Sequence, residues 1–276
     1  MNSLIRRTLS GIVFLAVMIG GLLWNQYSFA ALMLLILIVC MIEFYQMTMK
    51  DRYGISRSWA IISSVFLFLL AFGVRAYGWE GRVLGLAFIP VLLVMIGSLY
   101  TKDRASFGEF ANLYTGILYI AFPLTLTNFA AFQGGVFRGL TLLSFFIIVW
   151  ASDVGAYCFG MALGQKYGKK LFPAISPKKS WIGAIGGFCT SVLAAWLVSV
   201  AGWLEIPWYH ALALGAIMDV FGVYGDLFES QWKRHYEVKD SGNIIPGHGG
   251  FLDRFDSALF AIPAAVIYLS CFNLFV

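Results

Sequence analysis

Nine apolar segments make up most of this chain of 276 residues, and most contain the ~17–25 residues that a helix needs to cross a bilayer. None alternates apolar and polar residues as a barrel strand does, and unpaired backbone groups are costly in hydrocarbon, so we expect helices. Hydrophobic residues reach 60%, above the ~45–50% of soluble proteins. The sequence therefore predicts an all-α, polytopic integral membrane protein with about nine transmembrane helices. The expected spans are residues 8–24, 29–47, 58–75, 82–99, 110–131, 139–161, 182–203, 208–229 and 257–275.

The distribution of the 19 Lys and Arg residues gives the expected orientation. If all nine segments cross the membrane, 16 of these residues fall on the side of the N-terminus, and only Arg75, Arg82 and Arg138 fall on the other. Cytoplasmic loops carry an excess of Lys and Arg. We therefore expect a multi-pass protein of the cell (inner) membrane with its N-terminus in the cytoplasm and its C-terminus outside.

The net charge of +5 does not indicate a nucleic-acid partner, because the basic residues lie in short loops between spans and form no extended soluble face. Anionic lipid or nucleotide explains them better. The four cysteines fall within apolar segments without a Cys-x-x-Cys spacing. This pattern indicates neither a disulfide nor a zinc site.

The densest cluster of charge lies between the last two apolar segments, at residues 230–256, which we call the charged segment. Its basic residues are suited to neutralise phosphates, and its carboxylates to hold a divalent cation that phosphates also bind. Its glycines at 247, 249 and 250 are expected to let backbone N–H groups approach an anion. Together these features predict nucleotide or phospholipid chemistry at the membrane boundary. The residues of the segment that we expect to take part are Lys233, Arg234, Lys239, Asp240, His248, Asp253, Arg254 and Asp256.

Acidic residues also occur inside apolar segments, where insertion of a carboxylate costs ~2.5–3.5 kcal/mol. Asp153 interrupts the sixth segment and is expected to organise or line a site. In the eighth segment, spacings of three, four and seven residues place polar side chains on one helical face, which predicts a polar cavity reaching the cytoplasmic surface. Glu43, in the second segment, is expected to face the interface or a basic neighbour. The polar face of the eighth segment comprises Asp219, Asp226, Ser230, Lys233 and Arg234.

Two blocks of the sequence resemble one known family. Ser-x-x-Lys-Arg from Ser230, four residues, Lys-Asp, and Pro-Gly-His-Gly-Gly-x-x-Asp-Arg-x-Asp ending at Asp256 are similar to the motif of the phosphatidate cytidylyltransferases, also called CDP-diacylglycerol synthases. The match runs unbroken through the charged segment. Ser-Pro-Lys-Lys-Ser-Trp from Ser176 resembles a second block of that family, which usually continues with Glu or Gln where this chain has Ile182. That departure removes an acidic or amide side chain and leaves Lys178 and Lys179 available.

The resemblance implies an enzyme of phospholipid biosynthesis that transfers CMP from CTP to phosphatidic acid and releases pyrophosphate. Because the attacking phosphate oxygen is already ionised, positioning and charge neutralisation suffice for catalysis. Mg²⁺ is expected at Asp226 and Asp253, with a second cation left open, in a homodimer within the bilayer. The expected catalytic residues are Asp226, Asp253, Asp256, Lys233, Arg234 and His248. The expected substrate-binding residues are Ser176, Lys178, Lys179, Ser230, Lys239, Asp240, Arg254, Asp153 and Asp219.

We expect one membrane domain over residues 1–276, because the polar link at 100–106 is too short to separate two domains. Residues 1–100 are expected to form a helical scaffold. Residues 107–276 are expected to form the catalytic region, with cytoplasmic loops at 162–181 and 230–256 where CTP is available.

The residues of the sequence are also compatible with two other functions. Intramembrane acids and glycine-containing helices also occur in transporters of anionic solutes, although here the polar residues gather at one face and no inverted repeat is evident. A related CTP-using lipid enzyme, such as a polyprenol kinase or an archaeal ether-lipid cytidylyltransferase, is the second alternative. The CDP-alcohol phosphatidyltransferases are disfavoured, because their Asp-Gly-x-x-Ala-Arg block is absent from this sequence.

Overall fold

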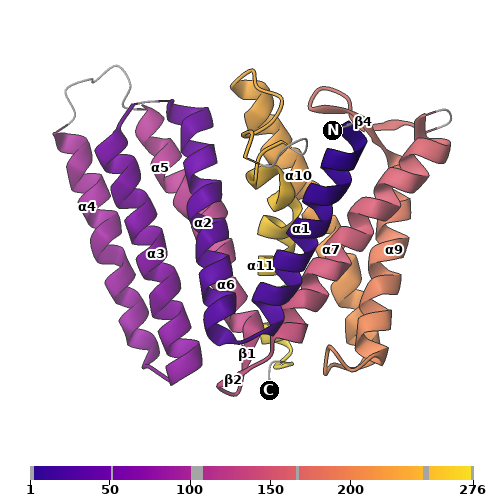
Figure 1. Ribbon diagram of the computed structural model, residues 1–276, viewed down its shortest axis with the longest axis horizontal. Helices are drawn as coiled ribbons and strands as arrows, with labels where there is room; N and C mark the ends of the chain where they lie inside the picture. Colours follow the sequence, from indigo (N-terminus) through magenta and orange to yellow (C-terminus); the bar gives the residue numbers. More distant parts are fainter. Residues whose placement is uncertain (1–2, 51, 101–107, 166–167, 245–248, 275–276) are drawn as a thin grey trace. The chain divides into compact units, whose positions relative to one another are not determined.

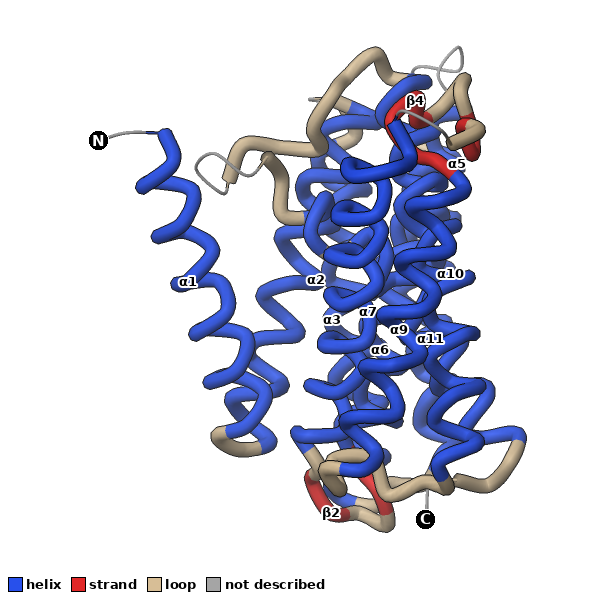
Figure 2. The backbone as a smooth tube through the Cα atoms, turned by 90° about the vertical axis from the view of Figure 1, so that its right-hand side faces the viewer, coloured by secondary structure: helices blue, strands red, loops and turns tan. Residues whose placement is uncertain are grey.

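Helices form nearly all of the regular structure in the computed structural model, which describes residues 3–50, 52–100, 108–165, 168–244 and 249–274 (Figure 1). Strands form two short antiparallel pairs (Figure 2). These observations confirm an all-α fold, and the long apolar helices are those of a multi-pass membrane protein. Among the described residues, six helical stretches are long and apolar enough to cross a membrane by length and composition: Gln26–Met49, Gly54–Tyr77, Phe110–Ala131, Gly139–Gly164, Trp181–Val200 and Trp208–His235.

The three remaining expected spans also contain helices in the described part of the chain, but shorter ones. These apolar helices cover Thr8–Leu23, Gly81–Gly97 and Asp256–Cys271. Every segment that the sequence singled out is therefore helical. The count of nine membrane crossings and the orientation of the N-terminus stay predictions.

The chain divides into two compact units, which are described separately. Unit 1 comprises Met1–Gly139 and Val238–Arg254, and unit 2 comprises Leu140–Glu237 and Phe255–Val276. The middle of the charged segment therefore belongs to unit 1, whereas its two ends belong to unit 2. This division does not test the expected single domain, which stays a prediction.

Unit 1 is built from helices around an aromatic core. Helix α2 packs against α1, α3 and α5, and α3 also packs against α4 and α6. The ring of Phe29 lies 5.8–6.3 Å, between centroids, from those of Phe68, Phe132 and Phe137. The elements are α1 (Ser3–Leu23), α2 (Gln26–Met49), α3 (Gly54–Tyr77), η1 (Gly81–Ala87), α4 (Phe88–Leu99), α5 (Phe110–Gly116), the π-helical turn η3 (Ile117–Ala121), α6 (Phe122–Ala131), β1 (Phe132–Gln133), β2 (Val136–Phe137) and η5 (Leu252–Arg254).

Helix α2 is fixed at its start and near its end by specific hydrogen bonds. The side-chain oxygen of Asn25 accepts from the backbone N–H groups of Tyr27 and Ser28, at 2.8 and 2.9 Å, and the Ser28 hydroxyl accepts from the Asn25 N–H at 3.0 Å. This reciprocal cap supplies partners for amides that the first turn leaves unpaired. Farther along, the buried hydroxyl of Tyr45 donates to the carbonyl of Leu113 at 2.9 Å.

Unit 2 is organised around its longest helix, α10, which packs against α9 and α11 (Figure 1). The contacts are close because glycine lies at each. A Cβ on Gly215 would come within 2.8 Å of the Val192 Cα, and a Cβ on Gly225 within 2.5 Å of the Asp256 carbonyl oxygen. Glycine at these two positions therefore lets α9 and α11 approach α10 closely. The elements are α7 (Gly139–Phe159, whose first residue falls in unit 1), the π-helical turn η4 (Gly160–Gly164), β3 (Lys170–Phe172), β4 (Ser176–Ser180), α9 (Trp181–Val200), α10 (Trp208–His235) and α11 (Asp256–Cys271).

The region expected as a loop at 162–181 contains regular structure. Strand β3 pairs with β4, with Lys170 opposite Ser180 and Phe172 opposite Ser176. Helix α9 begins at once after β4 because the Ser180 hydroxyl accepts from the backbone N–H of Gly183 at 3.2 Å. This hairpin holds the second family block at the start of a membrane-length helix.

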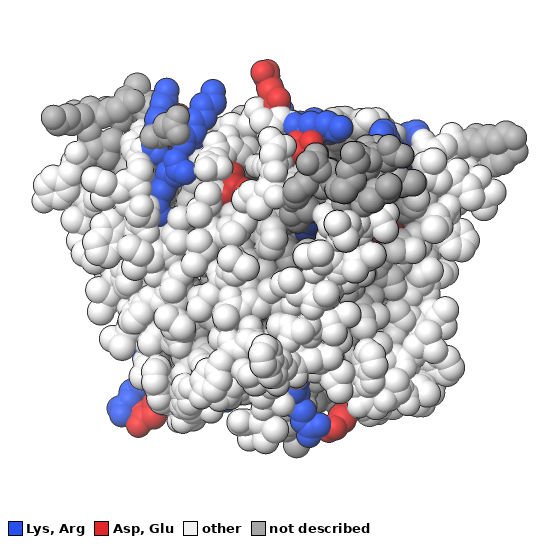
Figure 3. Space-filling view, viewed as in Figure 1, with Lys and Arg blue, Asp and Glu red and all other residues white. Residues whose placement is uncertain are grey.

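Charged side chains lie near the helix ends on the face of the molecule shown in Figure 3, and uncharged side chains cover the lengths between them. Large apolar residues are exposed along α9, including Ile185, Leu193 and Leu197, each more than half exposed. Such surfaces are costly in water and suited to lipid. The surface chemistry therefore agrees with helices that cross a membrane.

Candidate active site

An ion pair joins the second family block to the polar face of α10 within unit 2. The Nζ of Lys179, on β4, lies 2.7 Å from Oδ2 of Asp226. The other oxygen of Asp226 accepts a hydrogen bond from the Ser230 hydroxyl at 3.2 Å, one turn farther along α10. The spacing argument is thus confirmed for Asp226 and Ser230. The ammonium group beside this carboxylate belongs to β4, and the helical spacing along α10 does not predict that neighbour.

Three acids from three helices lie near one another in unit 2. Asp256, in the first turn of α11, interacts electrostatically with the like charges of Asp226 on α10 and Asp153 on α7, and with the opposite charge of Lys233. Two carboxylates about 4 Å apart repel by about 4 kcal/mol at an effective dielectric of 20. A cluster of this kind favours a bound cation. Asp153 thus interacts with one of the expected site acids, and its role in organising a site stays a prediction.

The end of α10 carries two further expected residues with partners in unit 2. Lys233 is buried and forms an ion pair with Glu229, one turn earlier on the same helix. Arg234 is exposed and donates through Nε to the carbonyl of Ile175 at 3.4 Å, which ties the helix end to the β3–β4 hairpin. Glu229 was not among the expected residues, although its spacing of four from Lys233 is a recognisable signal.

The hairpin presents the other residues of the second family block. Ser176 is half-buried and Lys178 is exposed. The Lys178 carbonyl accepts from the side-chain amide of Gln165 at 2.8 Å, and Gln165 in turn accepts from the Lys170 ammonium at 2.8 Å. These bonds hold the hairpin backbone and leave the charged tip of Lys178 at the surface.

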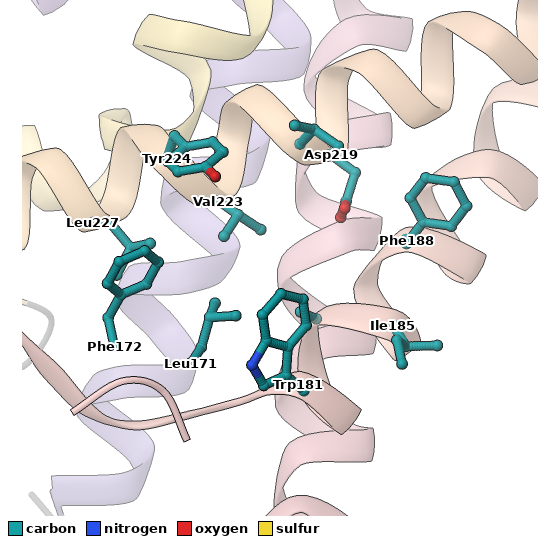
Figure 4. A pocket seen from close by; sticks show the side chains of 11 residues that line it. Leu171, Phe172, Trp181, Ile185, Phe188, Asp219, Val223, Tyr224 and Leu227 are labelled. Carbon is teal, nitrogen blue, oxygen red and sulfur yellow. The ribbon is translucent and has the colours of Figure 1, made fainter. Parts of the chain in front are cut away.

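Asp219 lies deeper along α10 and is buried. The Ser152 hydroxyl of α7 donates to its Oδ1 at 2.5 Å. Asp219 also lines a pocket of about 380 Å³ between α9, α10 and β3, and it is the charged residue among the lining side chains (Figure 4). Trp181 and Phe188 border the space toward which Asp219 points (Figure 4). The cavity expected along α10 is therefore mostly apolar at this level.

The part of the charged segment in unit 1 is organised around Asp253. Its Oδ2 accepts from the backbone N–H groups of Ser241 and Gly250, at 3.1 and 2.8 Å. Gly249 has φ +83°, a backbone conformation that glycine adopts readily, and it brings the chain back toward Asp253. The amide of Gly250, expected to face an anion, thus holds a carboxylate of the protein itself.

The remaining expected residues of this segment fall into two groups. Lys239, Asp240 and Arg254 are exposed in unit 1. His248 lies outside the described residues, as does Gly247. Their expected roles stay predictions.

The expectation that Glu43 faces the interface or a basic neighbour was wrong. Its side chain is 1% exposed, and it accepts hydrogen bonds from Ser241 and Leu252 of the charged segment. Sequence reasoning also missed Ser152 and Gln165. Ser152 is a polar residue in an apolar segment and Gln165 lies in the expected loop at 162–181, and neither position indicates its partner from sequence.

Among the described residues, no group of three or more His, Cys, Asp and Glu side chains is arranged to hold a metal ion. Mg²⁺ does not need one, since it usually binds through one or two carboxylates together with water and phosphate oxygens. The repulsion that Asp256 experiences from Asp226 and Asp153 suits such an ion. A cation at Asp226 would share that carboxylate with Lys179 or exchange with it.

The expected ligand pair is divided between the units, since Asp226 belongs to unit 2 and Asp253 to unit 1. The structure describes each in its own surroundings. Their joint binding of one ion stays a prediction.

Comparison with known proteins places this chain in a family. The sequence profile of the cytidylyltransferase family matches residues 5–272. The chain is 33% identical over 273 residues to the phosphatidate cytidylyltransferase of Bacillus subtilis, covering 96% of each protein. It is 33% identical to that of Staphylococcus saprophyticus, covering 94% of each, and 32% identical to that of Staphylococcus aureus, covering 95% of this chain and 98% of the relative. The chain belongs to the cytidylyltransferase family.

Proposed function

We propose that this protein is a phosphatidate cytidylyltransferase, which transfers CMP from CTP to phosphatidic acid and so forms CDP-diacylglycerol and pyrophosphate. The observation that carries the proposal is the match to relatives of that name over at least 94% of both chains. The two motif blocks lie within the matched region, and the hydrogen bonds and ion pair around Asp226 connect them.

In the proposed reaction, a phosphate oxygen of phosphatidate attacks the α-phosphorus of CTP. One P–O bond forms, the bond to the β-phosphate breaks, and pyrophosphate leaves with the electron pair. No proton relay is needed, because the attacking group is already an anion. The protein instead neutralises and orients the phosphates. The proposed basic contacts are Lys178, Lys179, Lys233, Arg234, Lys239 and Arg254.

We propose Mg²⁺ as the cofactor, with Asp226 and Asp253 as ligands and Asp256 as a further ligand or hydrogen-bond acceptor. The cation would withdraw charge from the phosphate oxygens as the new bond forms. Support comes from the carboxylates that surround Asp256. Asp253 is held by two backbone amides, which fix its orientation. Binding of a second cation is part of the same proposal and awaits a count of bound metal.

We further propose nine membrane crossings, an N-terminus in the cytoplasm, and an active site that faces the cytoplasm from the cell (inner) membrane. The distribution of Lys and Arg supports this arrangement. An enzyme that joins a soluble nucleotide to a bilayer lipid needs its site at that boundary. A homodimer is proposed from the family resemblance alone.

The deciding experiment uses purified protein with radiolabelled CTP, phosphatidate and Mg²⁺. We expect labelled CDP-diacylglycerol and one equivalent of pyrophosphate, and loss of both products with excess EDTA. Release of CDP with a phosphorylated lipid would indicate a kinase instead. Solute uptake into liposomes without any lipid product would indicate a transporter.

A further inference from the structure

A buried carboxylate on α2 contacts the charged segment within unit 1. Glu43 is 1% exposed, and its Oε2 accepts from the backbone N–H of Leu252 at 2.8 Å and from the Ser241 hydroxyl at 3.2 Å. Burial of a carboxylate is costly unless hydrogen bonds compensate for the lost water. Both compensating donors belong to the segment that carries Asp253.

The backbone of the segment closes around this carboxylate at two glycines. A Cβ on Gly242 would overlap Oε1 of Glu43. A Cβ on Gly250 would overlap the Ser241 hydroxyl oxygen first and would also lie 2.8 Å from Oε2 of Glu43. A side chain at 242 would therefore push the segment away from α2, and one at 250 would displace Ser241, which donates to Glu43.

The same residues that bind Glu43 also hold Asp253. Ser241 donates its hydroxyl to Glu43 and its backbone N–H to Asp253, at 3.2 and 3.1 Å. Leu252, the other donor to Glu43, directly precedes Asp253 in the chain. Gly250, which packs against Glu43, donates its N–H to Asp253 at 2.8 Å. Any shift of the segment relative to Glu43 therefore moves Asp253 as well.

We propose that Glu43 is a positioning residue, which fixes the backbone at Ser241 and Leu252 next to Asp253 so that this carboxylate has one orientation during the reaction. The inference rests on the proposed function. Residues that orient a reactive or metal-binding carboxylate through hydrogen bonds typically contribute about 10–100-fold to activity or metal affinity. Packing alone would give Glu43 no such effect on turnover.

The first test compares Glu43→Gln with Glu43→Leu in protein reconstituted into nanodiscs. Gln keeps an acceptor oxygen for both donors, whereas Leu has a similar size and no acceptor. We expect Glu43→Leu to lower kcat about 10–100-fold, with KM for CTP within about threefold of wild type. We expect Glu43→Gln to retain most of the turnover. Thr48→Val, on the same helix, is the matched control, because the buried Thr48 hydroxyl bonds only within α2 to the Phe44 carbonyl at 2.9 Å in the described structure.

The second test does not depend on activity. Backbone amide exchange of a peptide covering residues 249–255 should rise at least about tenfold in Glu43→Leu and stay near wild type in Thr48→Val. Unchanged exchange in Glu43→Leu would overturn the inference, as would a wild-type kcat. Faster exchange throughout unit 1, together with a lower melting temperature, would leave Glu43 as a structural residue only and would equally overturn it.

A third variant tests the same proposal if Glu43→Leu does not fold. Gly242→Ala adds one methyl group against Glu43 from the side of the segment, without changing α2. It should reproduce the loss of kcat and the faster exchange at 249–255. If wild-type protein forms no CDP-diacylglycerol, the proposed function fails, and the exchange data alone then decide whether Glu43 holds the segment.

Discussion

The ammonium group of Lys179 lies 2.7 Å from the Asp226 carboxylate and joins two positions that are separated by almost fifty residues of sequence. One strand of a hairpin and one membrane-length helix supply the partners. Each carries a charge that the other neutralises. This pair is therefore the most direct link between the fold and the proposed chemistry.

Replacement of Lys179 by Gln should lower kcat/KM for CTP by about 10–150-fold, because a hydrogen bond between charged groups is worth about 1.5–3 kcal/mol. The variant also removes the cation that neutralises Asp226, so the carboxylate would repel the incoming phosphates. Steady-state kinetics with phosphatidate in mixed micelles measure the change. Lys169→Gln, at an exposed position just before β3, is the control and should stay within about twofold. Equal losses in both variants would show that the hairpin needs only general positive charge.

Asp253→Asn should lower kcat on the order of 100-fold or more while leaving a folded membrane protein. Asn keeps an oxygen that can accept from Ser241 and Gly250, so the geometry of the segment survives and the negative charge is lost. Product formation is measured across a Mg²⁺ titration, with Glu237→Gln as a control in the same charged segment, at a position where the family motif specifies no residue. Wild-type activity of Asp253→Asn at limiting Mg²⁺ would remove Asp253 from the metal site.

Ser152→Ala should lower the free energy of unfolding by about 0.6–1.7 kcal/mol, the usual range for hydrogen bonds between membrane helices. The change leaves the buried Asp219 without the hydroxyl that lies 2.5 Å away. Thermal unfolding in detergent measures the effect. Ser144→Ala is the matched control on the same helix, because its hydroxyl bonds to the Leu140 carbonyl one turn earlier. A larger loss in Ser144→Ala than in Ser152→Ala would contradict the assigned role of the bond between α7 and α10.

A C-terminal alkaline phosphatase fusion should be active and a C-terminal GFP fusion dark, because nine crossings place the two chain ends on opposite sides of the membrane. A GFP fusion truncated after residue 104 should fluoresce, since four crossings return the chain to the cytoplasm. Reporter assays in a bacterial host measure both. Fluorescence at the C-terminus would mean an even number of crossings and would overturn the proposed topology.

The sequence by itself determined the class of fold and the family. Bilayer thickness sets a length that apolar segments such as 29–47 must meet, and hydrocarbon excludes unpaired backbone, so membrane helices can be predicted from composition alone. The motif spacing likewise brought Asp226 and Ser230 onto one face of α10, because a helix repeats every 3.6 residues. Both arguments depend only on residues that are close to one another in the sequence.

Only the tertiary structure decided which distant groups meet. Glu43 with Leu252, Ser152 with Asp219, and Lys179 with Asp226 are partners whose separations in sequence follow no period. Their pairing depends on how helices pack through contacts such as that at Gly225, and a buried polar group accepts whichever donor the packing supplies. For this reason Glu43 could be recognised in the sequence as an unusual residue, but its contact with the segment that carries Asp253 could not.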